Sequence, residues 1–146
     1  MVLKTEWISG DAKYGDSKLQ TFNPLFPRGG YFGLVSLIGP ANLFDIHPSL
    51  TLDLSKKVVL NMDCDIFWRY SKNDGIYGPN AVLIYPGNNT SHKFIGKQFS
   101  TDLVYSPTKF LYFRTEFTWF KAGGFLKEVS PGKDILFSAV TVQLKF

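Results

Sequence analysis

The sequence is nearly free of cysteine, since Cys64 is the only one among 146 residues. A lone cysteine cannot pair within the chain, which excludes a disulfide-stapled scaffold. Charged residues are also scarce at 19%, and with 45% hydrophobic residues this composition excludes a disordered chain. Long apolar runs are missing too. The longest, residues 31–38, is far shorter than the roughly 20 residues that a membrane-spanning helix needs.

Several functional signals are absent as well. There is no Gly-rich phosphate loop, and neither His47 nor His92 has a carboxylate or cysteine at a recognisable metal-ligand spacing, so we expect no metal and no cofactor. No nucleophile, base and orienting group can be assembled, which argues against an enzyme. The net charge of +4 is not clustered beyond Lys56-Lys57, so nucleic acid is not an expected partner. Residues 1–7 lack the features of a signal peptide. We therefore expect either a cytoplasmic chain or a piece of a longer protein.

The clearest positive signal is alternation with a period of two in segments rich in aromatic residues. In residues 58–70 every second side chain, from Val58 to Tyr70, is apolar or aromatic, and Asn61, Asp63 and Asp65 lie between them. Residues 110–121 and 135–146 repeat the pattern. This period predicts β-strands with one apolar and one largely polar face. Cys64 falls on the apolar face, where a packed or lipid-facing residue is expected rather than a nucleophile.

Six strands are predicted, and helix has almost no support beyond a short helical turn at residues 33–38. The strands are expected at residues 2–9, 48–54, 58–70, 94–105, 110–121 and 135–146. Residues 55–57 and 106–109 form tight connections, whereas residues 10–47, 71–91 and 122–134 are long and rich in turn-forming residues. An antiparallel meander would place all short turns at one end and all long loops at the other. That asymmetry is typical of an outer-membrane barrel.

Two architectures share this alternation. A soluble β-barrel or sandwich would turn its apolar face inward and could bind a small apolar ligand. A transmembrane barrel would turn that face outward to lipid. The strands of about ten residues or more match a tilted bilayer crossing. Aromatic residues at the strand ends, such as Tyr112 and Trp119, resemble the two interfacial girdles and favour the membrane alternative.

The loop at residues 10–47 permits two interpretations. Phe22, Phe26 and Tyr31 are too apolar for a freely solvated loop, and Pro24 and Pro27 stiffen it. It either folds into the pore as a plug or gate, or packs over the barrel rim. The sequence does not separate these two, and packing over the rim is the simpler expectation.

Four segments carry a resemblance to known proteins. Val140-Thr-Val-Gln-Leu-Lys-Phe146 resembles the terminal strand of bacterial outer-membrane proteins, which the barrel-assembly machinery reads. The other three are Leu19-Gln-Thr-Phe-Asn-Pro-Leu-Phe-Pro-Arg-Gly-Gly-Tyr-Phe-Gly33, Phe67-Trp-Arg-Tyr70 with Asp74-Gly-Ile-Tyr-Gly78, and Leu111-Tyr-Phe-Arg-Thr-Glu-Phe-Thr-Trp-Phe120. They resemble the C-terminal part of the alginate-export family of outer-membrane barrels, over residues 10–146.

The resemblance implies a many-stranded barrel in the outer membrane that passes an anionic polysaccharide such as alginate, or a similar solute. Because single-chain barrels start at eight strands and an open edge cannot sit in lipid, residues 1–146 are expected to be one barrel segment. That segment is the C-terminal portion of a larger barrel or closes by association. We therefore predict an all-β antiparallel meander with long external loops and short periplasmic turns, in contact with outer-membrane lipid.

Strand parity divides the candidate site residues into two sets. The predicted channel-lining residues are Asn61, Asp63, Asp65, Arg69, Arg114, Glu116, Thr141, Gln143 and Lys145. The predicted membrane-facing residues are Leu60, Met62, Ile66, Trp68, Phe113, Phe117, Trp119, Val142, Leu144 and Phe146. Arg69 and Arg114 either contact a passing anion or only pair with Asp65 and Glu116. The polar set is mixed in charge, whereas a polyanion pore should be lined by bases, so any basic constriction is expected elsewhere.

Overall fold

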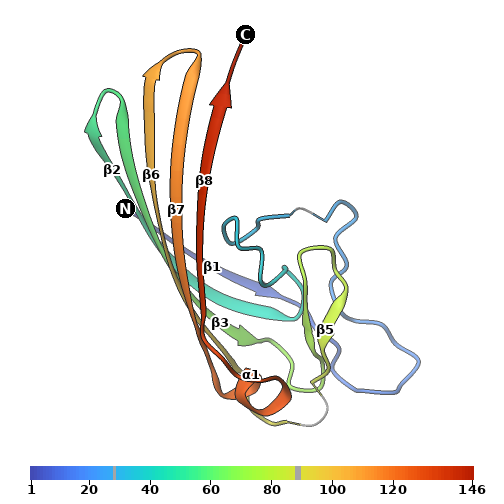
Figure 1. Ribbon diagram of the computed structural model, residues 1–146. Helices are drawn as coiled ribbons and strands as arrows, with labels where there is room; N and C mark the ends of the chain where they lie inside the picture. Colours follow the sequence, from blue (N-terminus) through green and yellow to red (C-terminus); the bar gives the residue numbers. More distant parts are fainter. Residues whose placement is uncertain (28, 88–89) are drawn as a thin grey trace.

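Six strands form one antiparallel sheet, hydrogen-bonded in chain order (Figure 1). The computed structural model describes residues 1–27, 29–87 and 90–146. Arg28, from the first segment that carries the resemblance, and Asn88 and Asn89, from the second long loop, lie outside the described residues. The strands are β1 (Val2–Ile8), β2 (Leu43–Ser55), β3 (Val58–Arg69), β6 (Phe94–Thr108), β7 (Leu111–Ala122) and β8 (Ile135–Leu144). The predicted all-β meander is confirmed, and its edge strands β1 and β8 do not pair with each other.

The connections differ in length at the two ends of the sheet, as predicted. The tight turns between β2 and β3 and between β6 and β7 lie together at the upper end in Figure 1. The three long connections gather at the other end and fold to one side of the sheet. The described parts of the long loops are therefore concentrated on one face and at one end of the sheet.

Three local expectations were wrong or incomplete. Strand β2 begins at Leu43 rather than at residue 48, because Pro48 is tolerated opposite Leu3 of β1 and does not start the strand. The second long loop contains a small hairpin of β4 (Ile76–Tyr77) and β5 (Leu83–Tyr85), and the third contains the short helix α1 (Gly124–Val129). No helix forms at residues 33–38, since Gly33 (φ +94°) and Ser36 (φ +51°) adopt backbone angles that an α-helix does not use.

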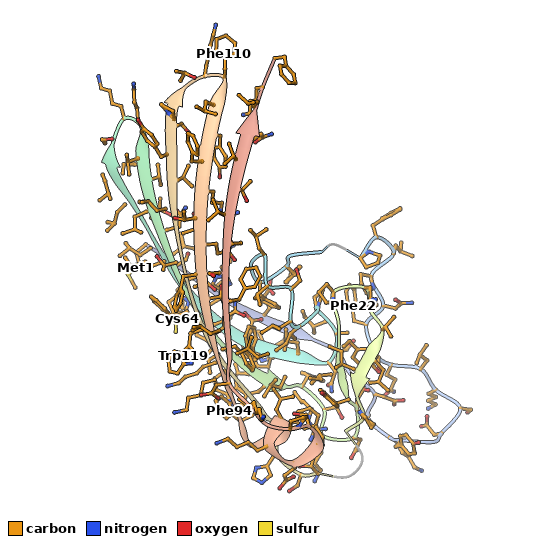
Figure 2. All side chains as sticks on the ribbon, in the orientation of Figure 1. Met1, Phe22, Cys64, Phe94, Phe110 and Trp119 are labelled. Carbon is orange, nitrogen blue, oxygen red and sulfur yellow. The ribbon has the colours of Figure 1, made fainter. Side chains whose placement is uncertain are left out.

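The sheet has two faces of opposite character, which we call the loop face and the outer face. On β3 the loop face carries Asp63, Asp65 and Phe67, and the outer face carries Met62 and Ile66. The loop face is identified by the long loops that bond to it. The outer face lies on the opposite side, as Figure 2 shows for Cys64 and Trp119.

The hydrophobic core is confined to the end of the loop face that the long loops cover. Phe67 of β3 and Phe120 of β7 are fully or almost fully buried there, together with Phe32 of the first loop and Phe125 of α1. Phe32 and Phe67 meet edge to face, with ring centroids 4.9 Å apart. By parity Phe67 and Phe120 belong to the polar face of their strands. They are apolar because loops and helix, rather than water, cover that end of the sheet.

Candidate functional site

A polar array occupies the middle of the loop face, on strands β3, β6 and β7. Asn61, Asp63 and Asp65 alternate along β3, and register places them opposite Asp102, Ser100 and Gln98 of β6. The next strand continues the array, because Gln98, Ser100 and Asp102 lie opposite Phe120, Thr118 and Glu116 of β7. A cavity of about 220 Å³ lies above this array, between the strands and residues 31–33 of the first loop.

Arg114 is bound to two carboxylates at the edge of this cavity. Its Nη2 donates to Oδ1 of Asp102 at 3.0 Å and to Oε2 of Glu116 at 2.8 Å. The side chain of Arg114 is still 28% exposed, whereas that of Glu116 is 2% exposed. Asn61 extends the network by donating to Oδ2 of Asp102 at 3.0 Å. The expected pairing of Arg114 with Glu116 is therefore present, and a partly open cationic group remains beside it.

A short stretch of the first loop is tied across the array. The Gln98 side chain donates to the Phe32 carbonyl at 2.7 Å, and the Leu34 backbone N–H donates to the Glu116 carboxylate at 3.0 Å. The Tyr31 hydroxyl donates to the Glu6 carboxylate of β1, and burial and the nearby Glu6 charge raise the pKa of this phenol. The loop is therefore bonded to the polar face itself, well inside the sheet rather than only at its rim.

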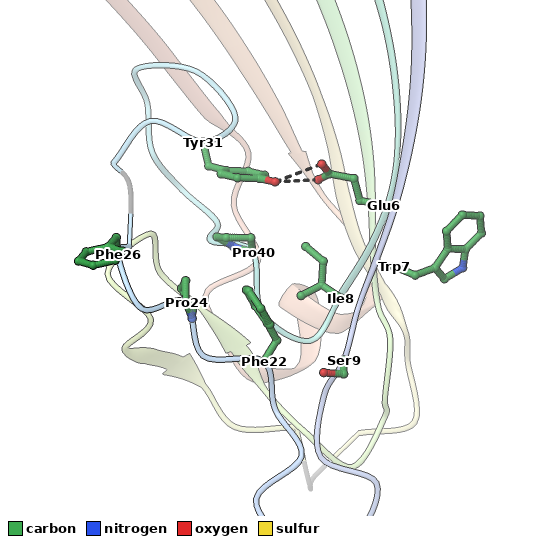
Figure 3. Close-up of a pocket in the computed structure, with 9 residues that line it drawn as sticks. All are labelled: Glu6, Trp7, Ile8, Ser9, Phe22, Pro24, Phe26, Tyr31 and Pro40. Carbon is green, nitrogen blue, oxygen red and sulfur yellow. Dashed lines mark hydrogen bonds between the residues drawn. The ribbon is translucent and has the colours of Figure 1, made fainter.

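A second, larger cavity lies between this loop and β1 (Figure 3). It has a volume of about 660 Å³, and its walls include Ile8, Phe22, Pro24 and Pro40. Figure 3 shows the Tyr31–Glu6 hydrogen bonds closing one side of it, while Trp7 points away to the opposite side of β1. The Phe-Asn-Pro-Leu-Phe-Pro segment therefore forms one wall of a mostly apolar hollow above β1.

Arg69 does not lie in the open part of the loop face, which differs from the expectation that it lines the channel. It is 1% exposed and lies under the second long loop. Its guanidinium group donates six hydrogen bonds of 2.6–3.1 Å to the carbonyls of Lys72, Asp74, Gly87, Thr90 and His92. Its charged group also lies 4.2 Å from the Phe125 ring centroid. The expected pairing with Asp65 is absent, because these carbonyls take all its donors.

Asp74 connects the first long loop to the second. Its carboxylate accepts from the backbone N–H groups of Asp11 and Gly75 and from the hydroxyls of Thr21 and Tyr77, at 2.5–2.9 Å. Burial, followed by the hydrogen bond to Asp74, raises the pKa of Tyr77 to about 12. The two segments Phe67–Tyr70 and Asp74–Gly78 thus supply the groups, Arg69 and Asp74, that hold the loops together.

The predicted membrane-facing residues within strands β3, β7 and β8 share the outer face, where they are half-buried to exposed. Val142 and Leu144 of β8 are 59% and 63% exposed, and Phe117 of β7 is 40% exposed. At the loop end, Trp7, Phe44, Trp68 and Phe94 stack across four neighbouring strands, with centroids 5.0, 5.3 and 5.9 Å apart. Tyr105 and Phe113 form a second aromatic pair near the tight turns, 6.1 Å apart.

The predicted site residues near the end of the chain are placed by the β7–β8 register. Thr141 lies opposite Arg114 and Gln143 opposite Tyr112, so both share the loop face and are exposed. Val142 lies opposite Phe113 on the outer face. Lys145 and Phe146 follow the last residue of β8, and both are exposed.

Sequence reasoning missed a group of metal-ligating side chains on β2 and β3. Nε2 of His47 lies 2.6 Å from Oδ1 of Asp63, and Nδ1 lies 3.1 Å from Oδ1 of Asp65. One ligand atom each from Asp45, His47 and Asp65 can be chosen so that all lie within 4.8 Å of one another. The expectation that His47 has no carboxylate at ligand spacing was wrong, since it overlooked Asp45, two residues away on the same strand, and had no information on Asp65 of β3. Recognising Asp45 and His47 as alternate residues of one strand would have found two of the three.

The fold is an open antiparallel meander of six strands, as expected for part of a β-barrel. Residues 1–134 match the family model described as alginate export, and the chain belongs to this family of outer-membrane export proteins. The match ends just before β8 begins at Ile135. No curated protein and no solved structure matches the chain. The described residues contain no helix long and apolar enough to cross a membrane.

Proposed function

We propose that this chain forms one segment of a channel wall in the outer membrane, through which an anionic polysaccharide such as alginate passes. The loop face would line a water-filled passage and the outer face would contact lipid. The single observation that carries the proposal is the separation of the two faces. The long loops fold onto the polar side of the sheet and leave the apolar side uncovered.

The outer face has the chemistry of a lipid contact. Most of its residues are aliphatic or aromatic, and aromatic groups gather near both ends of the strands, as in the girdles of outer-membrane barrels. Strand β3 has 12 residues and spans about 40 Å, which is enough to cross a hydrocarbon layer while tilted. An apolar face of this extent is costly in water but stable against lipid.

The loop face provides a polar wall with a built-in narrowing. Residues 31–34 are bonded to Gln98 and Glu116, and they stand between the cavity and the larger hollow beside β1. This supports the interpretation of the first loop as a constriction inside the passage over packing at the rim alone. Arg114 is the partly exposed cation at this level, so it is the residue through which this wall would contact an anion.

The charge of the wall bears on which solute is favoured. Asp102 and Glu116 bond to Arg114, and Asp63 lines the same cavity, so this segment is not a basic surface. A passage for a polyanion then requires basic groups on other parts of the wall. The edges of β1 and β8 likewise require partners, since unpaired strand edges are not stable in lipid. Both needs would be met by further strands, from a longer polypeptide or from other copies.

The alternative of a soluble barrel or sandwich with an apolar ligand inside has less support. In that architecture residues such as Phe117 and Val142 would be packed in a closed interior. Here they are exposed, and the covered side of the sheet carries Asp65, Gln98 and Glu116. Binding of a small apolar ligand would be confined to the hollow of Figure 3, at the mouth of the proposed passage.

Planar-bilayer recording tests the proposal directly. The closed barrel that contains this segment should conduct ions when inserted in a bilayer, and alginate oligosaccharides added to one side should reduce the current. Arg114→Ser frees Asp102 and Glu116 from their pairing, so the reversal potential in a salt gradient should shift toward cation selectivity. Lys56→Ser, in the exposed turn between β2 and β3, is the matched control and should leave the potential unchanged. The absence of conductance, or equal potentials for both variants, would refute the proposed channel wall.

A further inference from the structure

The buried carboxylate of Asp45 has no hydrogen-bond partner among the described residues. Asp45 is 0% exposed, and neither of its oxygens accepts a hydrogen bond within the part of the chain that the structure describes. An unpaired carboxylate at such a depth is strongly destabilising unless a cation or a proton balances it. Glu6 of β1 lies directly opposite in the β1–β2 register, so the neighbouring group adds negative charge instead of balancing it.

Two further ligand atoms converge on the same place from the adjacent positions of the sheet. His47 follows Asp45 by two residues and therefore shares its face of β2. Asp65 comes from β3 and approaches the imidazole, with its Oδ1 at 3.1 Å from Nδ1 of His47. The three potential ligand atoms lie within 4.8 Å of one another. Backbone register, rather than a flexible loop, holds this arrangement.

We propose that Asp45, His47 and Asp65 bind a divalent transition-metal ion of the Zn²⁺ type. One imidazole nitrogen and two carboxylate oxygens suit such an ion, whereas Ca²⁺ and Mg²⁺ prefer oxygen ligands alone. Two ligands on tetrahedral zinc, each about 2.0–2.2 Å from the metal, lie roughly 3.4 Å apart. The observed 3.1 Å between His47 and Asp65 is close to that value, so this pair needs little adjustment to bind the ion.

A neighbouring carboxylate orients the histidine for this role. Asp63 Oδ1 lies 2.6 Å from Nε2 of His47, which leaves Nδ1, 3.1 Å from Asp65 Oδ1, as the nitrogen that would bind the metal. A carboxylate that accepts from the far nitrogen of a metal-binding histidine is the common outer partner in such sites. Three protein ligands leave one coordination position open for water or an anionic group. The site is independent of the proposed solute, since it needs only the β2–β3 pairing.

Cobalt binding to the folded protein in detergent tests the site. Co²⁺ is the probe because its visible ligand-field absorption reports four-coordinate geometry, and Zn²⁺ should displace it. We expect one equivalent to bind wild-type protein and Asp45→Asn to weaken binding at least about tenfold. Asp53→Asn is the matched control, an aspartate on the same face of β2 but outside the group, and it should bind as wild type does.

Thermal unfolding separates loss of the site from loss of the fold. Zn²⁺ should raise the unfolding midpoint of wild type and Asp53→Asn but not that of Asp45→Asn. Without metal, Asp45→Asn should be at least as stable as wild type, because it removes an unpaired buried charge. If wild type takes up no Co²⁺, or Asp45→Asn binds it equally well, the proposal is wrong. A proton shared by Asp45 and Glu6 would then balance the carboxylate.

Discussion

Replacing Arg69 with glutamine should open the second long loop while leaving the six-stranded sheet intact. Arg69 is buried at the end of β3 and bonds to five carbonyls, all between residues 72 and 92. Glutamine has two N–H donors in place of five, and it carries no charge. The variant therefore leaves several carbonyls buried without donors, unless the loop moves away and exposes them to water.

The size of the effect follows from these contacts. A hydrogen bond to a charged group contributes about 1.5–3 kcal/mol, and breaking a buried ionic network costs about 3–5 kcal/mol in total because the terms are not additive. Local opening limits the loss, since the freed carbonyls then bond to water. We expect the loop to lose about 3 kcal/mol or more of local stability. The sheet retains its own strand pairing and should be little affected.

Hydrogen exchange with mass spectrometry measures this change segment by segment. Amides of residues 70–87 should exchange roughly a hundredfold faster in Arg69→Gln, at about tenfold per 1.4 kcal/mol, whereas those of β6 and β7 should not change. Lys93→Gln is the control, because Lys93 is exposed and makes one bond, to the Tyr70 carbonyl at 2.8 Å. Unchanged loop exchange together with altered ion selectivity in Arg69→Gln would refute this reasoning and return Arg69 to the channel wall.

Two further predictions concern the outer face and the loop junction. Phe117→Arg, in the middle of β7, should cost about 2–4 kcal/mol of stability in bilayer refolding. Phe113→Arg, two residues from the start of β7, should cost about 0–1 kcal/mol. Equal small costs for the two variants would contradict contact with lipid. Burial and the hydrogen bond to Asp74 raise the pKa of the Tyr77 phenol to about 12. The protonated phenol should therefore stabilise the loop fully below pH 10, and this contribution should be lost as the pH passes 12. Ultraviolet titration, with Tyr77→Phe subtracted, should show a lower pKa in Asp74→Asn, and an unchanged value would count against the junction.

The strands were predictable because their pattern reflects a local rule, alternation between two environments. In β3 the rule holds from Leu60 to Ile66, and both faces emerge from it without knowledge of the neighbouring strands. The alternation rule failed at β2, where Pro48 led to a predicted start of the strand that was too late. It also missed α1, a helix of six residues whose burial depends on Phe125 fitting under Arg69.

The site residues were less predictable because their roles depend on contacts distant in sequence. Parity placed Arg69 and Arg114 on the same face, but it could not show that one lies beneath a loop and the other at a cavity. The Asp45–His47–Asp65 group likewise depends on strand register. Sequence spacing indicates only the two members of the group on β2. Asp65 lies on β3 and comes beside them because β3 pairs with β2.

The central claim is that the loop face meets water and the outer face meets lipid, and cysteine scanning along β8 in the outer membrane tests it most directly. In a Cys64→Ser background, single cysteines at residues 139–144 would be exposed to a charged, water-soluble thiol reagent and to a lipid-soluble one. The account predicts that positions 139, 141 and 143 react with the charged reagent, and that positions 140, 142 and 144 react with the lipid-soluble one. Reversed labelling, or labelling without alternation, would contradict it.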